Sequence, residues 1–374
     1  MFFGLDLDGL QVYWWIVLSL LGGLLVFMFF VQGGQTLLDE LSENELEKTM
    51  LVNSLGRKWE LGFTTLVLFG GAAFAAFPLF YATSFGGAYW AWLAILFCFI
   101  LQAVSYEYRK KEGNPYGAKT FEIFLKINGF LGVFLIGVAL SSFFSGSHFV
   151  LSEQNFVLWQ SEWRGLELLA NPCNYLLGFA LVFLSRILGL GYFMNNIDDA
   201  NIKAKIPKKA LFNSLLFLVF FLAFLGWIFA KDGFVLGESG VEMKANAYLL
   251  AFLGNLPLLV LLLVGVVLVL FGIYKLGVKK CSCAIWGLGL GSVLAIFALL
   301  LSLGLGGGVF YPSISDLQSS LSIKNASSST YTLSVMAYVS LLVPFVLAYI
   351  AYVWRAMDRV KISKDEMSES HHLY

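Results

Sequence analysis

Long apolar runs recur along the whole chain and constrain its fold more than any other feature of the sequence. A run of about 20 apolar residues can cross a bilayer as a helix, because lipid offers no partner for an unpaired backbone amide or carbonyl. We count nine such runs, at 12–31, 61–83, 89–106, 121–144, 172–193, 210–230, 248–274, 283–305 and 333–354. The sequence therefore predicts an all-α polytopic protein with about nine transmembrane helices, and residues 1–374 are expected to form a single integral membrane domain.

Basic residues between the runs indicate the orientation, since Lys and Arg near span ends are retained on the cytoplasmic side. Eighteen of them lie in segments that a periplasmic N-terminus would place inside the cell, against four in the opposite loops. We therefore expect a periplasmic N-terminus and a short cytoplasmic tail, residues 355–374. Asp6 and Asp8 stand where a signal peptide would have basic residues, so no cleaved signal is predicted.

The sequence offers few ligands for a cofactor of its own. Buried haem iron needs axial His or Met ligands within the bundle, but His148 lies in a polar loop and His371 and His372 lie in the tail. Cys281 and Cys283 fall short of a tetrahedral metal site, and we interpret them as small packing residues. We expect no haem and no metal on this chain. A net charge of zero also argues against a nucleic-acid partner.

Ionisable side chains at membrane depth are costly, so each one is a functional candidate. Glu60 follows Trp59 at the cytoplasmic entrance of the second run, after the basic residues Arg57 and Lys58. Glu107 ends the third run, two residues before an arginine. Either carboxylate could relay protons or form half of an ion pair with these basic neighbours. Glu60, Trp59 and Glu107 are the candidate residues of a proton path.

Two further features have local structural interpretations. Arg186 lies in the middle of a run and should face the bundle interior or a subunit interface, with structural pairing favoured. Ser42 followed by Glu45 predicts a capping box, and apolar residues at helical spacing follow it. We expect this segment to be an amphipathic helix lying on the inner membrane surface.

Several segments together resemble subunit II of the cytochrome bd-type quinol oxidases. They run in family order along the whole chain, and the family likewise has nine spans. The segments are Trp14-Trp15, NSLGRKW at 53–59 followed by Glu60, GGAAFAAFPLFYAT at 70–83, YEYRKK at 106–111, LANP at 169–172, FYPS at 310–313, NASSSTYTLSVM at 325–336 and the terminal HHLY.

The resemblance implies a heterodimer of two similar nine-span subunits in a bacterial inner membrane, forming a respiratory terminal oxidase that oxidises quinol and reduces dioxygen to water. Subunit I would hold the haems, and this chain would be its haem-free partner, with no complete active site alone. In the family the acid after the tryptophan is associated with proton supply from the cytoplasm, and the matching residue is Glu60. The sequence does not show which quinone is used or whether this chain binds one. It also leaves open whether subunit I holds haem d or only b-type haems, and whether a small single-span subunit is present.

The chain departs from the family at four positions near proposed proton, oxygen or lipid-quinone paths. Gln32 and Gln35 stand in place of two acids, Thr65 in place of an aromatic ring, and Gln102 where an arginine is common. Carrying those paths over to this chain is therefore not justified. The chain looks like a divergent branch of the family, for which cyanide insensitivity is one candidate property.

Two other classes of function compete with this interpretation. A secondary transporter would suit broken spans with the polar groups Asn128, Asn174 and Asn255. Against it, the two halves of the chain contain no matching pair of interrupted spans. A passive assembly factor would need no acid at position 60. We favour the oxidase subunit.

Overall fold

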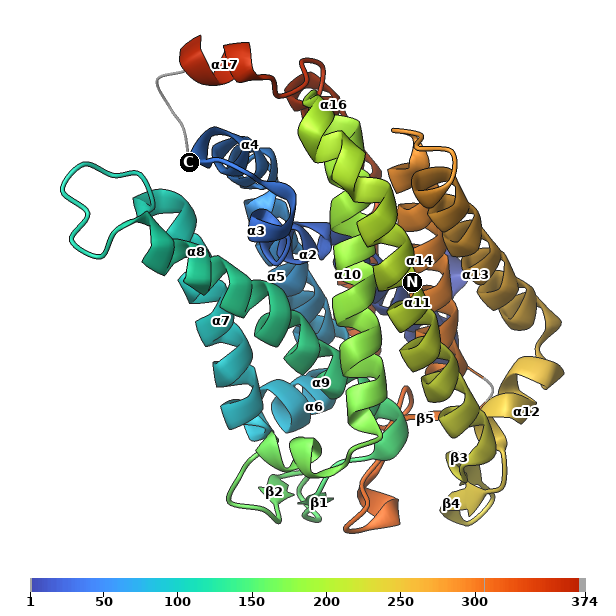
Figure 1. The fold of residues 1–374 in the computed structure, drawn as a ribbon. Coiled ribbons are helices and arrows are strands. Elements are labelled where there is room, and N and C mark those ends of the chain that lie inside the picture. Colours follow the sequence, from blue (N-terminus) through green and yellow to red (C-terminus); the bar gives the residue numbers. More distant parts are fainter. Residues whose placement is uncertain (1, 306, 370–374) are drawn as a thin grey trace.

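The computed structural model describes residues 2–305 and 307–369, so His371 and His372 lie outside the described residues. Within this part of the chain, nine helical segments are long and apolar enough to cross a membrane, as the sequence predicted. They are Leu7–Gln35, Glu45–Ala76, Tyr89–Tyr108, Ala118–Ser145, Asn174–Asn196, Ala200–Ala230, Leu256–Gly277, Ala284–Gly304 and Thr330–Met357. Figure 1 shows them as a bundle.

Several spans consist of more than one helix. The first divides at Phe29 into α1 (Leu7–Met28) and α2 (Phe30–Gln35). The fourth contains a π-helical turn, η3 (Asn128–Gly132), between α8 (Ala118–Ile127) and α9 (Val133–Ser145). The remaining long helices are α5 (Trp59–Ala76), α7 (Tyr89–Tyr108), α10 (Asn174–Asn196), α11 (Ala200–Ala230), α13 (Leu256–Gly277), α14 (Ala284–Gly304), α15 (Thr330–Ser340) and α16 (Val343–Met357).

The core of the bundle forms around α1, α10 and α14. In the most apolar stretch of each span, the share of residues that are buried is 78% for α10 and 72% for α14. The corresponding share for the ninth span is 11%. Gly33 of α2 allows the closest of these approaches, because a Cβ there would collide with the backbone at Ser185 of α10. In lipid no hydrophobic force drives helices together, so their association depends on close packing. Small residues such as Gly33 allow the backbones to approach closely enough for this.

Three antiparallel hairpins cover one end of the bundle, at the bottom of Figure 1. They pair β1 with β2, β3 with β4 and β5 with β6. Single bridges between Ser147 and Ser313, and between Val235 and Gly308, connect these loops to one another. The strands are β1 (Phe149–Leu151), β2 (Val157–Trp159), β3 (Gly233–Gly237), β4 (Gly240–Lys244), β5 (Val309–Tyr311) and β6 (Leu321–Ser322).

Short helices close the other end: α3 (Leu38–Leu41), α4 (Glu45–Gly56) and α17 (Lys364–Glu369). The predicted capping box was wrong, because Asn44 caps α4 by accepting from the Glu47 amide, whereas the Ser42 hydroxyl donates to the Leu38 carbonyl. The buried face of α4 is also wider than that of the predicted amphipathic helix. Every residue of α4 from Thr49 to Gly56 is buried. One cause is that α17 packs on α4.

Candidate functional site

Glu60 lies in the first turn of α5 with its side chain exposed on the outside of the bundle. The two basic residues expected to pair with Glu60 form their ion pairs with other acids. Arg57 Nη2 lies 2.5 Å from Glu366 Oε1, and Lys58 Nζ lies 2.9 Å from Asp358 Oδ1. In the described part of the chain, no cation lies within ion-pair distance of Glu60. The purely structural explanation of this acid, pairing with its basic neighbours, is therefore wrong.

Trp59 connects the start of α5 to the interior. Its ring stacks on that of Tyr106 of α7, with centroids 5.7 Å apart and planes inclined by 15°. Trp59 is half-buried, whereas Tyr106 is buried. The hydroxyl of Tyr106 accepts a hydrogen bond of 3.1 Å from Gln35 Nε2. The stack therefore lies between the exposed carboxylate and a buried polar group.

Gln32, Gln35 and Gln102, here called the amide cluster, form that polar group. All three side chains are fully buried. Gln102 Oε1 accepts from Gln32 Nε2 at 2.7 Å and from Gln35 Nε2 at 3.0 Å. The structure thus brings together three of the four positions at which the sequence departs from the family, although α2 and α7 are distant in sequence. Thr65, the fourth, donates to the Leu61 carbonyl within α5.

Several polar atoms in and beside the amide cluster have no hydrogen-bond partner among the described residues: Gln32 Oε1, Gln35 Oε1, Gln102 Nε2 and both polar atoms of the Asn128 side chain. Buried polar atoms of this kind are usually satisfied by ordered water. Asn128 begins the π-helical turn η3, which packs on α2. Such turns are frequent at functional sites. The cluster is a polar but uncharged region, which cannot itself take up or release a proton at neutral pH.

Glu107 does not pair with Arg109, so that alternative for Glu107 was wrong. The Arg109 guanidinium is buried, with Nη2 2.8 Å from Glu122 Oε1 and 2.6 Å from Glu45 Oε1. Lys48 Nζ adds a contact of 3.0 Å to Glu122. The Glu107 side chain instead points outward at the end of α7. The arginine holds α4, α7 and α8 together, and Glu107 remains a second exposed acid at this end of the bundle.

Arg186 is paired inside the bundle, as the sequence favoured. Its Nη2 lies 2.5 Å from Glu40 Oε1, its Nε donates to Asn213 at 2.6 Å, and its Nη1 donates to Thr36 Oγ1 at 2.8 Å. Burial acts to raise the pKa of Glu40, but hydrogen bonds from Lys209 and Arg186 outweigh it and hold the pKa below its usual value. Arg186 is therefore paired with an acid inside the bundle, and its contacts connect α10 to α3 and α11.

The three asparagines of the transporter alternative do not form one site. Asn174 Nδ2 donates to the Leu168 carbonyl at 2.9 Å, at the start of α10. Asn255 caps α13 by accepting from the Leu258 amide. Asn128 lies apart from both, beside the amide cluster. Two of the three thus satisfy local backbone groups, which argues against a shared substrate site.

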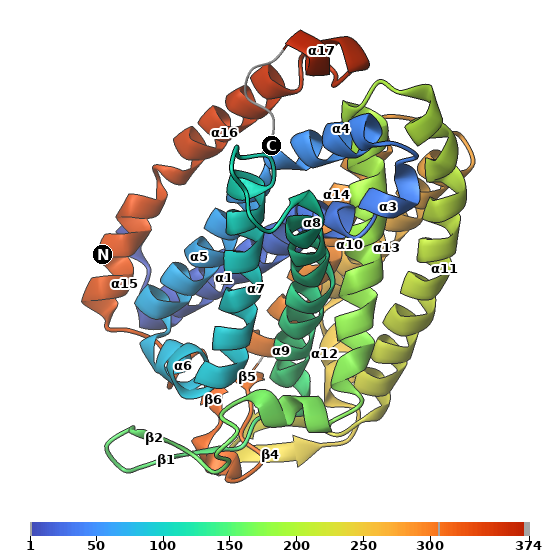
Figure 2. The same cartoon turned by 60° about the vertical axis from the view of Figure 1, so that its left-hand side comes forward.

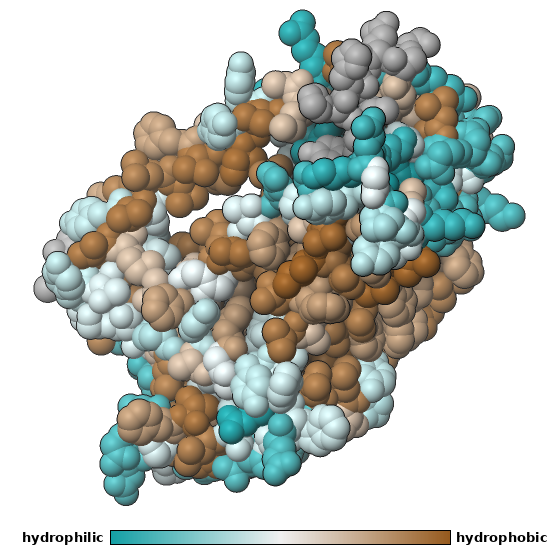
Figure 3. Space-filling view, turned by 90° about the vertical axis from the view of Figure 1, so that its left-hand side faces the viewer, coloured by the Kyte–Doolittle hydropathy of each residue, from teal (hydrophilic) through white to brown (hydrophobic). Residues whose placement is uncertain are grey.

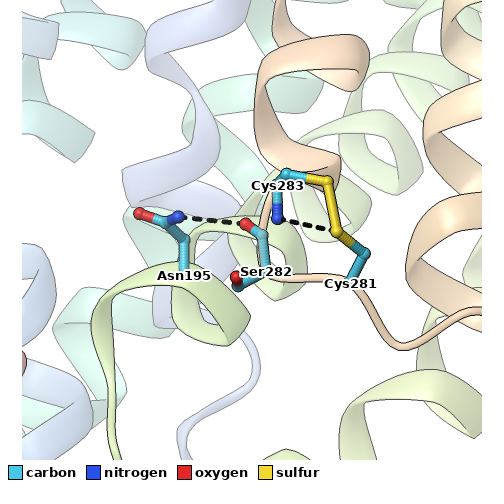
Figure 4. The surroundings of a disulfide bond; sticks show 4 residues. All are labelled: Asn195, Cys281, Ser282 and Cys283. Atoms are coloured by element: carbon cyan, nitrogen blue, oxygen red, sulfur yellow. Dashed lines mark hydrogen bonds between the residues drawn. A yellow bond between two sulfur atoms is a disulfide. The ribbon is translucent and has the colours of Figure 1, made fainter.

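Cys281 and Cys283 form a disulfide bond between α13 and α14, so their interpretation as separate packing residues was wrong (Figure 4). Asn195 of α10 donates to the Ser282 carbonyl between them at 3.0 Å. The sequence gives little signal for this bond, because a Cys-X-Cys spacing is equally compatible with free thiols. Within the described ranges, no group of three or more His, Cys, Asp or Glu side chains could hold a metal ion. His148 is exposed in the turn before β1.

The comparisons with known proteins agree with this architecture. Residues 10–357 match the family model described as cytochrome bd terminal oxidase subunit II. The chain is 28% identical to the cytochrome bd-I ubiquinol oxidase subunit 2 of Escherichia coli K12, covering 99% of this chain and all of the relative. It is 26% identical to the cytochrome bd ubiquinol oxidase subunit 2 of Bacillus subtilis 168, covering 91% and 93%. A chain of the bd oxidase structure from Geobacillus thermodenitrificans shares the fold, with a TM-score of 0.65 and 13% identity over 93% of this chain and 98% of that one.

Proposed function

This chain belongs to the cytochrome bd terminal oxidase subunit II family, and on that premise we propose that it is the haem-free subunit of a quinol oxidase and supplies cytoplasmic protons to its partner. As a subunit of this oxidoreductase it takes part in oxidising quinol and reducing dioxygen. Reducing dioxygen to water consumes as many protons as electrons, so the complex needs a route for protons. The haems, b-type with or without haem d, belong to subunit I in this proposal, since no histidine lies in the nine candidate spans.

The observation that carries the proton proposal is the exposed, unpaired carboxylate of Glu60. A relay group must both accept and release a proton, so a carboxylate held by a fixed cation would be poorly suited. Arg57 and Lys58 are each paired with another acid, and this leaves Glu60 without a fixed cation among the described residues. Trp59 and Glu107 are the accompanying candidates.

We place the amide cluster beside this route and not on it. Glu60 points out of the bundle, whereas Gln32 packs toward Gly62 on the inner side of α5. Amides do not titrate near neutral pH, so protons would have to pass along ordered water there. No quinone site is assigned to this chain.

The surface offered to subunit I includes α16 and the outer face of α5. No residue of α16 is buried, and Phe345 and Tyr352 are each 73% exposed. In Figure 2 α16 runs apart from the rest of the bundle, and Figure 3 shows it as an apolar ridge beside an opening. A span so poorly packed within its own chain is well suited to packing against another, and Glu60 lies on the same exposed side of α5.

The proposed orientation places the N-terminus in the periplasm and residues 355–374 in the cytoplasm of a bacterial inner membrane. Four of the five basic segments support it, because ion pairs join the segments around residues 43–58, 109–119, 199–209 and 355–366 at one end of the bundle. Arg109 contacts Glu45, Lys205 contacts Glu43 at 3.1 Å, and Lys364 contacts Asp199 at 3.0 Å. This end carries most of the Lys and Arg, which the positive-inside rule assigns to the cytoplasm.

Replacing Glu60 tests the proposal directly. Glu60→Gln keeps the shape and hydrogen bonding of the side chain but removes its titration. We expect the complex to assemble with normal haem content and to turn over quinol several-fold more slowly, while Glu60→Asp retains more activity. The measurement is oxygen uptake per haem by the purified complex.

Glu162→Gln is a matched control, because Glu162 is an exposed acid at the hairpin end. Its turnover should equal that of the unmodified complex. Normal turnover per haem in Glu60→Gln would remove Glu60 from the proton path. Parallel loss of haem and activity would instead assign it to assembly.

A further inference from the structure

A pocket of about 720 Å³ opens where α7 ends and α8 begins. Its lining is mainly apolar and aromatic, with Val104 and Tyr108 from α7 and Phe121 and Phe124 from α8. The polar members, among them Lys111, Asn114 and Thr120, come from the connecting loop and the first turn of α8. The site thus combines an apolar floor with a polar, cationic rim, and it takes no part in the proton route proposed above.

The loop that forms the rim is held in place by its own hydrogen bonds. Asn114 Oδ1 accepts from the Tyr116 and Gly117 amides at 2.9 and 3.2 Å, and Thr120 Oγ1 donates to the Tyr116 carbonyl at 2.8 Å. Gly113 and Gly117 have φ angles of +77° and +73°, which favour glycine. The rim of the pocket is therefore fixed by local hydrogen bonds and by the backbone conformation of its two glycines.

The rim carries positive charge that the chain itself leaves uncompensated. Lys111 lines the pocket, and Lys110 and Lys119 directly precede the lining residues Lys111 and Thr120 in the chain. In the part of the chain that the structure describes, these three lysines have no carboxylate within ion-pair distance, whereas Arg109 and Lys48 nearby are each paired with acids. Lys111 Nζ lies over the Tyr108 ring, 4.7 Å from its centroid. Glu112 is the one acid among the lining residues. Lys111 and Glu112 cancel within the lining itself, and the flanking Lys110 and Lys119 give residues 110–119 a net positive charge that an anionic group here would meet.

The apolar floor continues into the outer surface of the span. Below the pocket, Ile123, Phe130 and Leu131 are 53%, 45% and 41% exposed, and Ile100 of α7 is 46% exposed. These side chains lie within the candidate spans and so face acyl chains or a partner. Charged lysines lie at one end of an apolar track, which is the arrangement of a membrane interface.

We infer that this pocket binds a phospholipid with an anionic headgroup, such as phosphatidylglycerol, with its phosphate at the lysine rim and an acyl chain along α7 and α8. A soluble anion would account for the lysines but not for the apolar floor that extends into the membrane. A neutral lipid would account for the floor but not for three unpaired lysines. The inference does not depend on the role of Glu60.

Native mass spectrometry of the purified oxidase complex tests the inference. The complex in neutral detergent is titrated with dioleoylphosphatidylglycerol or dioleoylphosphatidylcholine. The lysine variant is Lys110→Gln/Lys111→Gln/Lys119→Gln, and we expect its apparent Kd for phosphatidylglycerol at the tightest site to rise roughly a hundredfold. Val104→Trp, which fills the floor without changing charge, should also weaken binding.

Lys275→Gln/Lys279→Gln/Lys280→Gln is a matched control, because it removes three lysines that also lack carboxylate partners in the described structure, from the turn after α13. It should bind phosphatidylglycerol as the unmodified complex does. The inference is overturned if the lysine variant and Val104→Trp both keep normal affinity, or if phosphatidylcholine binds equally well. It is also overturned if inorganic phosphate displaces the lipid, since that would indicate a site for the anion alone. Val104→Trp decides the matter if the lysine variant does not assemble.

Discussion

Lys231 shows how a single half-buried charge can be held by aromatic rings instead of an acid. Its Nζ donates to the Phe144 carbonyl at 2.6 Å and lies 5.3, 5.2 and 5.9 Å from the ring centroids of Trp227, Phe234 and Tyr248. Burial lowers the pKa of Lys231 from 10.5 to about 8. Cation–π contacts of this kind favour the ammonium form and partly offset the cost of burying it.

The lowered pKa predicts that stability depends on pH. Between pH values of about 8 and 10.5 the unfolded chain binds more protons at this lysine than the folded chain, so its contribution to stability rises with pH across that window. Lys231→Gln should abolish that part of the rise in Tm between pH 7.5 and pH 10, measured on the purified complex. Lys244→Gln, an exposed lysine at the same end, should leave the rise unchanged. Identical pH profiles for all three proteins would contradict the prediction.

The sequence identified the chemistry of the site but not its arrangement. Glu60, Trp59, Gln32, Gln35 and Gln102 are all recognisable in the sequence as acids, aromatics or departures from the family. That Gln32 meets Gln102, 70 residues away, depends on how α2 and α7 pack, and hydropathy carries no information on this. The partners of Arg57, Lys58 and Arg109 were missed for the same reason, since each pairs with an acid far along the chain or in another helix.

At the level of helices, the contact of α2 with α10 depends on Gly33. A Cβ at this position would collide with the backbone at Ser185, and backbone atoms cannot rotate away. We expect Gly33→Ala to destabilise the complex by about 1–3 kcal/mol, as overpacking usually does. The loss should appear as a lower Tm and a lower yield of assembled oxidase.

Gly226→Ala provides the comparison, because nothing lies within 4 Å of a Cβ at Gly226 of α11. Alanine favours helix over glycine, so this variant should be neutral or slightly stabilising. A Gly33→Ala complex as stable as the Gly226→Ala complex would show that α2 and α10 can separate at little cost.

Helix existence was predictable from the sequence, but helix interruptions were not. Runs of apolar residues predicted all nine spans within the described residues, because burying a helix in lipid requires little else. Hydropathy averages over a break such as Phe29 or the turn η3. It also merged α12 (Ala247–Gly254) with α13, although the chain bends at Asn255 before Pro257. These details depend on tertiary packing and on individual caps.

For the whole molecule, the distribution of charge predicts which end faces the cytoplasm. Alkaline phosphatase is active only in the periplasm, so a fusion after Tyr374 should be inactive and a fusion in the hairpin β3–β4 should be active. Enzyme activity normalised to fusion protein level gives the answer. An active fusion after Tyr374 would refute the proposed orientation.

The ion pairs that close the basic end have a consequence for the timing of biosynthesis. Lys58 pairs with Asp358 and Arg57 with Glu366, and Ile197 forms a bridge with Ile362. A ribosome must make all nine spans before it reaches these acids, so the two cations stay without those partners through most of translation. Formation of these two ion pairs therefore indicates that every span has been synthesised. In a chain stalled before Asp358, Lys58 and Arg57 would lack these acids and α4 would not be covered by α17. Quality-control proteases of the cell could recognise such a chain.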